Sequence, residues 1–141
     1  MNDKNSAPVV VGIDGSEASI AALRHARDLA EVLGRRVLAI SAWQLPAFYG
    51  GGPWAYDWDP AEDAKRVLDD AVIEVYGDAD PDSLSKEVAE CNPAAVLIRR
   101  SKDALMVAVG SRGHGGFAGL LLGSVSAAVA EHASCPVLVT H

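Results

Sequence analysis

The sequence predicts an α/β protein in which helices cover both faces of a parallel sheet. Short apolar runs rich in β-branched residues alternate along the chain with longer segments whose apolar residues recur at helical spacing. The apolar runs lack polar alternation, as expected of strands that are buried on both faces. A length of 141 residues without an internal repeat fits one domain. We therefore expect a single domain over residues 1–141, in which residues 1–7 form a disordered tail.

The first predicted unit is a strand, a helix and a second strand. Residues 8–13 form a β-branched run that ends in a turn at residues 14–16, and Ser16 is expected to cap the helix that follows. Apolar residues then recur at helical spacing until Gly34, which ends the helix. Residues 36–43 hold the next apolar run. Two such strands joined by one helix predict a right-handed βαβ unit.

The least regular part of the chain is a long loop over residues 44–60, rich in glycine and aromatic residues. A loop of this length in a compact domain is usually functional or mobile. It is either a surface loop pinned by its aromatic side chains, without a ligand role, or a lid or partner-binding surface. Apolar residues at helical spacing then predict a helix that begins near Pro60 and ends near Gly77.

Two further strands and one helix are predicted between residues 84 and 109. Residues 84–90 alternate weakly, which is typical of a short edge strand. Asn92 tolerates the left-handed conformation and is expected to supply the turn into a helix over residues 93–101. Residues 103–109 predict another buried strand.

A glycine-rich loop leads into the last helix, which is predicted over residues 124–133 and is followed by a fifth strand over residues 136–140. The spacing of the loop is glycine, two residues, glycine, nine residues, glycine-serine, at Gly110, Gly113, Gly123 and Ser124. Such a loop presents backbone N–H groups and the positive end of a helix dipole, which predicts anion binding, with a purely structural turn as the alternative. Ser124 is expected to cap the helix, to bind a phosphate, or to do both. The spacing fits neither the P-loop nor the dinucleotide fingerprint.

The composition excludes several classes of function. The 12 basic and 19 acidic residues give a net charge of −7, which argues against duplex nucleic acid as a partner. The apolar runs are too short to cross a membrane, and the first residues lack the apolar core of a signal peptide, so we expect a cytoplasmic protein. The 2 cysteines, expected to remain thiols, and the 4 histidines lack the spacing of a metal site.

At the four positions of its glycine-serine spacing, the loop resembles the nucleotide-binding signature of the universal stress protein family, in its ATP-binding branch. The resemblance also covers residues 9–16 and residues 135–139, and nearly the whole chain can be laid on the family's pattern, with a weak middle over residues 44–92. The chain departs from the family at Cys91-Asn92, where glycine is common.

The resemblance implies a Rossmann-like fold of the adenine nucleotide alpha hydrolase type, with a sheet order of 3-2-1-4-5. In that order the first strand lies beside the fourth. The ligand crevice of an open parallel sheet lies where the winding direction reverses. Asp14 and Gly110, which are 96 positions apart, would then flank one crevice.

The resemblance also implies the residues of an ATP site. Asp14 resembles the family's acid near the adenosine, although its carboxylate could instead cap its own turn. Ala42 falls where the family's backbone contacts adenine. In the family, the first part of the loop approaches the ribose and the inner phosphates, which implies this role for Gly110 and Gly113 and for Ser111 and Arg112 between them. The second part meets the outer phosphates, which implies that role for Gly123, Ser124, Val125 and Ser126. Arg112 either adds charge to the phosphates or is a solvated loop residue.

The implied function is a cytoplasmic ATP-binding regulator of the stress response, with Mg²⁺ or Mn²⁺ accompanying the nucleotide and no protein metal site. Because the family's last strand often pairs two subunits, the resemblance also implies a homodimer through Val137 to Val139. We expect adenine nucleotide as the small-molecule partner, and neither nucleic acid nor membrane.

Two alternatives remain open. The first is a slow ATPase or nucleotidyl-transferring enzyme, for which the sequence offers no second carboxylate or glutamine near the loop, so weak turnover at most is expected. The second is a non-nucleotide structural or interaction dimer of the same fold. A phosphoacceptor receiver domain is disfavoured. Its chemistry needs paired acids, an acceptor aspartate and a lysine at the ends of particular strands, and of these the sequence has only Asp14.

Overall fold

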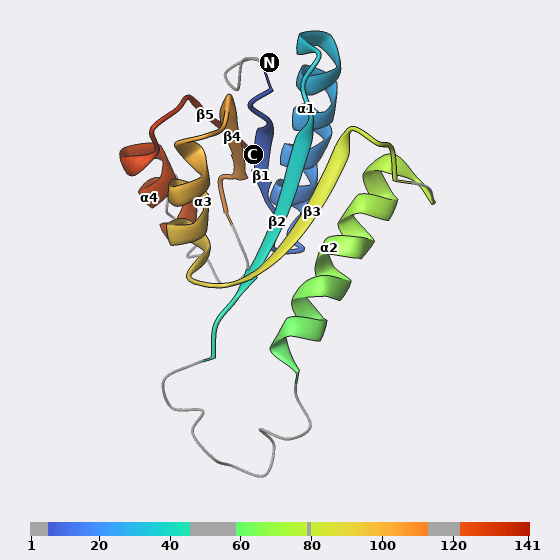
Figure 1. Ribbon diagram of the computed structural model, residues 1–141. Helices are drawn as coiled ribbons and strands as arrows, with labels where there is room; N and C mark the ends of the chain where they lie inside the picture. Colours follow the sequence, from blue (N-terminus) through green and yellow to red (C-terminus); the bar gives the residue numbers. More distant parts are fainter. Residues whose placement is uncertain (1–5, 46–58, 79, 113–121) are drawn as a thin grey trace.

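Five parallel strands and four helices make up the described part of the computed structural model, which covers residues 6–45, 59–78, 80–112 and 122–141 (Figure 1). The elements in chain order are β1 Val9–Gly12, α1 Glu17–Leu33, β2 Val37–Trp43, α2 Pro60–Tyr76, β3 Leu84–Glu90, α3 Pro93–Ser101, β4 Met106–Gly110, α4 Ser124–His132 and β5 Val137–Thr140. This architecture confirms the predicted fold class. Most of the expected tail and of the long aromatic loop lies outside the described residues.

The strand order is β3-β2-β1-β4-β5, which is the order that the resemblance implied. The central strand β1 pairs with β2 and with β4, so that Val9 lies opposite Val37 on one side and Met106 on the other. β3 pairs with β2 alone and alternates between less and more exposed residues, which confirms the predicted edge strand. The winding direction therefore reverses between β1 and β4.

Each face of the sheet has its own core. Val9 and Val11 of β1 pack with α1 and α2, whereas Val10 packs with α3 and α4. Figure 1 shows α1 and α2 on one face of the sheet and α3 and α4 on the other. Because both faces are covered, the strands need no polar side, which explains their uninterrupted apolar runs. Within the described ranges, no helix is long and apolar enough to cross a membrane.

Three of the helices begin at a residue whose side chain caps them. Ser16 accepts from the amide of Ser19, and Asp59 accepts from two amides of the first turn of α2. The predicted left-handed turn at Asn92 is wrong: its backbone is extended (φ −60°, ψ 131°) and its side chain accepts from Ala95 N at 3.2 Å. Asn92 is compatible with this site because a capping oxygen, not backbone freedom, is what α3 requires there.

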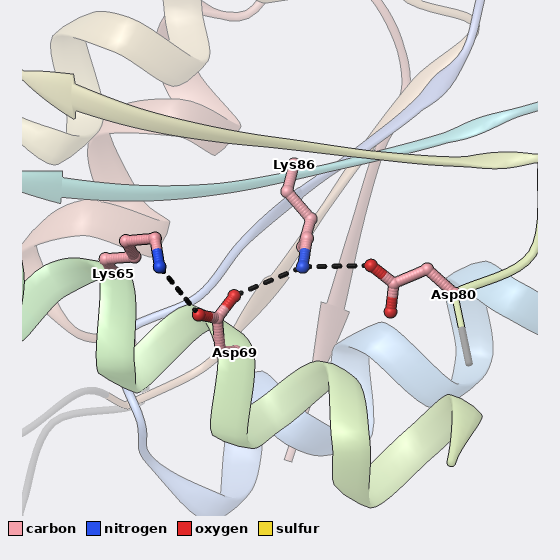
Figure 2. Close-up of polar contacts among 4 residues, drawn as sticks. All are labelled: Lys65, Asp69, Asp80 and Lys86. Carbon is pink, nitrogen blue, oxygen red and sulfur yellow. Dashed lines mark hydrogen bonds and ion pairs between the residues drawn. The ribbon is translucent and has the colours of Figure 1, made fainter. Parts of the chain in front are cut away.

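A chain of alternating charges joins α2 to the edge strand β3 (Figure 2). Lys86 Nζ lies 3.2 Å from Asp69 Oδ1 and 2.9 Å from Asp80 Oδ2, and Lys65 Nζ lies 3.5 Å from Asp69 Oδ2. The hydrogen bonds to Asp80 and Asp69 raise the pKa of Lys86. Burial raises the pKa of Asp69, but the bonds and charges of Lys86 and Lys65 outweigh it, so the pKa lies below the ordinary value of 3.8.

Candidate functional site at the strand crossover

A cavity of about 370 Å³ lies at the carboxyl ends of β1 and β4, where the strand order reverses. Its lining includes Gly12, Ile13, Asp14, Ser19, Ile40, Ala42, Pro93, Val96, Leu97, Val109, Gly110, Gly123, Ser124, Val125 and Ser126. Asp14 and Gly110, which the strand order was expected to place side by side, thus border one cavity. This is the position at which open parallel sheets bind their ligands.

The lining combines apolar and polar segments from different elements. Ile40 of β2, Val96 and Leu97 of α3 and Val109 of β4 contribute buried apolar side chains. The turn after β1 and the start of α4 contribute a carboxylate, hydroxyls and backbone amides. A ligand with a flat, weakly polar part and an anionic part would be matched by such a lining.

Asp14 is exposed in the cavity lining and also holds its own turn. Its Oδ1 accepts from Ser16 N at 2.9 Å and from Ser16 Oγ at 2.5 Å. Gly15 between them has a φ of 86°, a conformation that side chains disfavour. Both interpretations of Asp14 therefore have a structural basis, since the same carboxylate stabilises the turn and borders the cavity.

The start of α4 borders the cavity without a side-chain cap. Its N-cap residue is Gly123, which corrects the expectation that Ser124 caps the helix, because Ser124 is already its first residue. Among the four described helices, α4 alone has no side-chain cap. Gly123 has an extended backbone (φ −74°, ψ 173°) that any residue can adopt, so backbone conformation does not require glycine there. An anion at this position would meet the first amides of α4 and the positive end of its dipole.

Ser111 and Ser126 fix the base of the glycine-rich loop. The carbonyl of Ser111 accepts from Gly123 N at 2.6 Å and from Ser126 Oγ at 3.0 Å, and its own amide donates to Thr140 O at 2.6 Å. Ser126 lines the cavity, whereas Ser111 and Arg112 are not among its described lining residues. Gly113 lies outside the described residues.

Gly110 has a packing reason for being glycine. A Cβ built there would lie 2.7 Å from both the carbonyl carbon and the Cβ of Ala18, and 2.8 Å from Ser19 N. The first turn of α1 therefore sits directly on β4, and this close approach needs a residue without a side chain. The glycine pattern thus serves helix packing at Gly110 as well as the cavity.

Charged and metal-binding groups are sparse around the cavity. Asp14 is the one acidic or basic side chain in the described lining. Over the described ranges there is no group of three or more histidine, cysteine or carboxylate residues that could hold a metal. Cys91 and Cys135 are both free thiols, as predicted, and burial raises the pKa of Cys135 against the lowering effect of its hydrogen bond with Val107.

Several residues of the lining escaped prediction from the sequence. Ser19 lies in the first turn of α1 and Pro93 begins α3, and Val96 and Leu97 looked like ordinary core residues of a short helix. Their position near the carboxyl ends of the strands was the one available signal, since ligand crevices form there.

The profile of the universal stress protein family matches residues 6–141. The chain belongs to the universal stress protein family. A universal stress protein of Mycolicibacterium smegmatis is 39% identical over 137 residues, a match that covers 94% of this chain and 45% of that protein. The chain spans about half the length of the curated universal stress proteins that it matches.

Solved universal stress proteins share the fold. One was solved in complex with cAMP: it is 26% identical, with a TM-score of 0.64, and the match covers 96% of each chain. Another, from Archaeoglobus fulgidus in complex with dAMP, has a TM-score of 0.67 at 21% identity, covering 96% of this chain and 98% of that one. The second likeness shows the fold alone.

Proposed function

We propose that this chain binds an adenine nucleotide in the cavity between β1 and β4 and acts as a cytoplasmic, nucleotide-dependent regulator in the stress response. ATP accompanied by Mg²⁺ or Mn²⁺ is the expected form. The observation that carries the proposal is that the cavity joins Asp14 to the start of the one described helix without a side-chain cap. The related protein solved with cAMP supports a nucleotide as the ligand class.

Each part of the nucleotide has a matching part of the lining. The adenine would lie on the apolar side, against Ile40 and Leu97 and close to the backbone of Ala42. Both bonds from Ser16 go to Oδ1 of Asp14, so a ribose hydroxyl or the amino group would meet Oδ2. The phosphates would accept from the first amides of α4 and from the hydroxyl of Ser124.

The glycines of the loop give the phosphates room. We propose that glycine at position 123, the N-cap of α4, leaves room for an anion at the first turn of this helix, where an anion gains most from the helix dipole. Gly110 borders the same space from β4. We assign Ser111 and Arg112 to the approach to the inner phosphates with Gly113, and Val125 and Ser126 to the outer phosphates through their amides.

A divalent cation would be held chiefly by the nucleotide. Mg²⁺ is commonly coordinated by phosphate oxygens and waters with at most one or two carboxylates, so it needs no protein cage. Asp14 is the one carboxylate in the described lining. The cation would supply charge neutralisation, which is valuable in a chain of net charge −7.

We propose binding with little or no turnover. Hydrolysis needs a group that orients water and a group that stabilises charge on the transferred phosphoryl. In the described lining, Asp14 is assigned to the nucleoside and no histidine, lysine or arginine is present. Phosphate release under single-turnover conditions would separate a slow ATPase from a binder.

The test is to look for the nucleotide directly. Purified protein is denatured, and the supernatant is analysed by ultraviolet absorbance and mass spectrometry for adenine nucleotides. Protein stripped of nucleotide is then titrated calorimetrically with Mg-ATP, ATP with EDTA, cAMP and dAMP in turn. We expect saturable heat with at least one adenine nucleotide. No released nucleotide together with no heat from any of the four would overturn the proposal.

We propose a homodimer through the outer edge of β5. The carbonyl of Pro136 accepts from Val107 N of β4, and that of Thr140 accepts from Ser111 N just after β4. Val137 and Val139 therefore direct their backbone N–H and C=O groups away from β4. β5 is the last strand of the sheet and its sequence Val-Leu-Val-Thr carries no charge. Uncharged edges of this kind readily pair with a second strand.

A further inference from the structure

The turn that carries Asp14 is closed by a set of hydrogen bonds centred on Ser16. Ser16 donates twice to Asp14 Oδ1, through its amide at 2.9 Å and its hydroxyl at 2.5 Å. The same hydroxyl accepts from Ser19 N at 3.2 Å, which caps α1. Ser19 Oγ in turn donates to Ser16 O at 2.9 Å and accepts from Asp14 N at 3.4 Å. Asp14, Ser16 and Ser19 are therefore joined in one hydrogen-bonded group.

The chemistry of a hydroxyl fixes the direction of these bonds. A serine hydroxyl has one proton to donate and lone pairs to accept. At Ser16 the proton goes to Asp14 Oδ1 and the lone pairs take the amide of Ser19, so the cap of α1 and the orientation of the carboxylate depend on the same atom. Ser16 itself is not among the described residues that line the cavity, whereas Asp14 and Ser19 are.

We propose that Ser16 is a positioning residue for nucleotide binding, which holds the Asp14 carboxylate in one rotamer with Oδ2 toward the cavity. The proposal rests on the proposed function. Without Ser16 Oγ, the exposed Asp14 side chain would keep only the bond from the Ser16 amide at 2.9 Å. It would then sample other rotamers and would have to be immobilised when the nucleotide binds. Immobilising one side chain of this kind corresponds to a loss of affinity of about three- to tenfold.

The experiment compares Ser16→Ala with a matched loss of a helix cap elsewhere. Asp59→Ala removes the N-cap of α2, whose side chain accepts from Ala61 N and Glu62 N, and Asp59 is not among the described cavity residues. Both variants should lower the midpoint of thermal unfolding to a similar degree. Only Ser16→Ala should weaken the binding of whichever nucleotide, among Mg-ATP, cAMP and dAMP, the wild type binds most tightly. Ser16→Thr keeps a hydroxyl and should restore affinity.

A second measurement does not depend on a ligand. Three-bond couplings of the Asp14 side chain, measured by NMR, report whether it occupies one χ1 rotamer or several. We expect one rotamer in the wild type and in Asp59→Ala, and averaged couplings in Ser16→Ala. Unchanged couplings in Ser16→Ala, or an affinity equal to that of Asp59→Ala, would overturn the positioning role. A wild type that binds no nucleotide would refute the proposed function instead, and the couplings would still decide the role of Ser16.

Discussion

Replacing Gly110 by alanine should destabilise the protein through helix packing, before any effect on a ligand. The new Cβ would lie 2.7 Å from two atoms of Ala18 and 2.8 Å from Ser19 N, and two of these three contacts are with backbone. Backbone cannot rotate away, so α1 must shift as a body. Overpacking of this kind costs about 3 kcal/mol. The unfolded variant has less conformational entropy than the unfolded wild type, because alanine is less flexible than glycine, and this offsets about 0.7 kcal/mol of the cost. We expect a net loss of about 2 kcal/mol.

Gly12→Ala is the matched control. Gly12 also ends a central strand and lines the cavity, but its Cβ would meet the side chain of Leu97, with Cδ1 at 2.8 Å. A leucine methyl can rotate away at a cost of about 1 kcal/mol, which the unfolded-state term nearly cancels. The two variants should therefore differ by about 2 kcal/mol although their chemical change is identical.

The assay is denaturant unfolding of nucleotide-free protein, followed by the fluorescence of its 3 tryptophans. Nucleotide must be removed first, because a ligand bound to the native state adds its own stabilisation. For a chain of this size, the predicted difference corresponds to roughly 6 °C in the midpoint of thermal unfolding. Equal stabilities of Gly110→Ala and Gly12→Ala would refute the packing explanation of Gly110.

Three further predictions follow from the site, the ion network and the sheet edge. Gly123→Asp should cap α4 and raise the stability of the nucleotide-free protein by about 0.5 kcal/mol, while abolishing calorimetric nucleotide binding; retained affinity would show that no phosphate sits there. Lys86→Met removes the ion pairs of Lys86 and should lower the free energy of unfolding at neutral pH. The loss should be only about 1 kcal/mol, because solvent partly screens these ion pairs. The folded state lowers the pKa of Asp69 and raises that of Lys86, so the stability difference between wild type and Lys86→Met should persist from pH 3.8 to pH 10.5, the ordinary pKa values of the two groups. The stability difference should vanish as the pH falls through the folded pKa of Asp69, and also as the pH rises through the folded pKa of Lys86. A difference that is unchanged by pH would contradict the ion-pair origin. Val139→Pro removes an outward N–H of β5 and should convert a dimer into a monomer in light scattering with little loss of stability; a persistent dimer would place the interface elsewhere.

The fold could be predicted from the sequence because its determinants are local. Uninterrupted apolar runs, a capping Ser16 and a terminating Gly34 specify strands and helix ends through neighbouring residues alone. Gly34 ends α1 as predicted, and it does so with a left-handed backbone, at φ 65°. The lateral order of the strands is not local, and it was available only through the resemblance to the family.

The site could be predicted only in part, because its details depend on contacts between distant segments. The packing of Gly110 against Ala18 joins positions far apart in the chain, so the glycine looked like a loop residue alone. Ser16 was expected to cap α1 and does, but its bond to Asp14 depends on the rotamer of a second side chain. The cap at Gly123 in place of Ser124 differs by one residue, within the range that sequence signals resolve poorly.

The parallel pairing of β1 with β4 also affects the folding kinetics. The cavity draws on residues from Gly12 to Ser126, and the base of its loop is tied to Thr140. A partly folded βαβ unit ending at β2 holds Asp14 and Ala42 but lacks Gly110 and the start of α4, to which the phosphates are assigned. If the proposed site is right, nucleotide would bind only after the long-range closure of β4 onto β1, the slow and entropically costly event of such a topology. Ligand should thus slow unfolding while leaving the folding rate nearly unchanged.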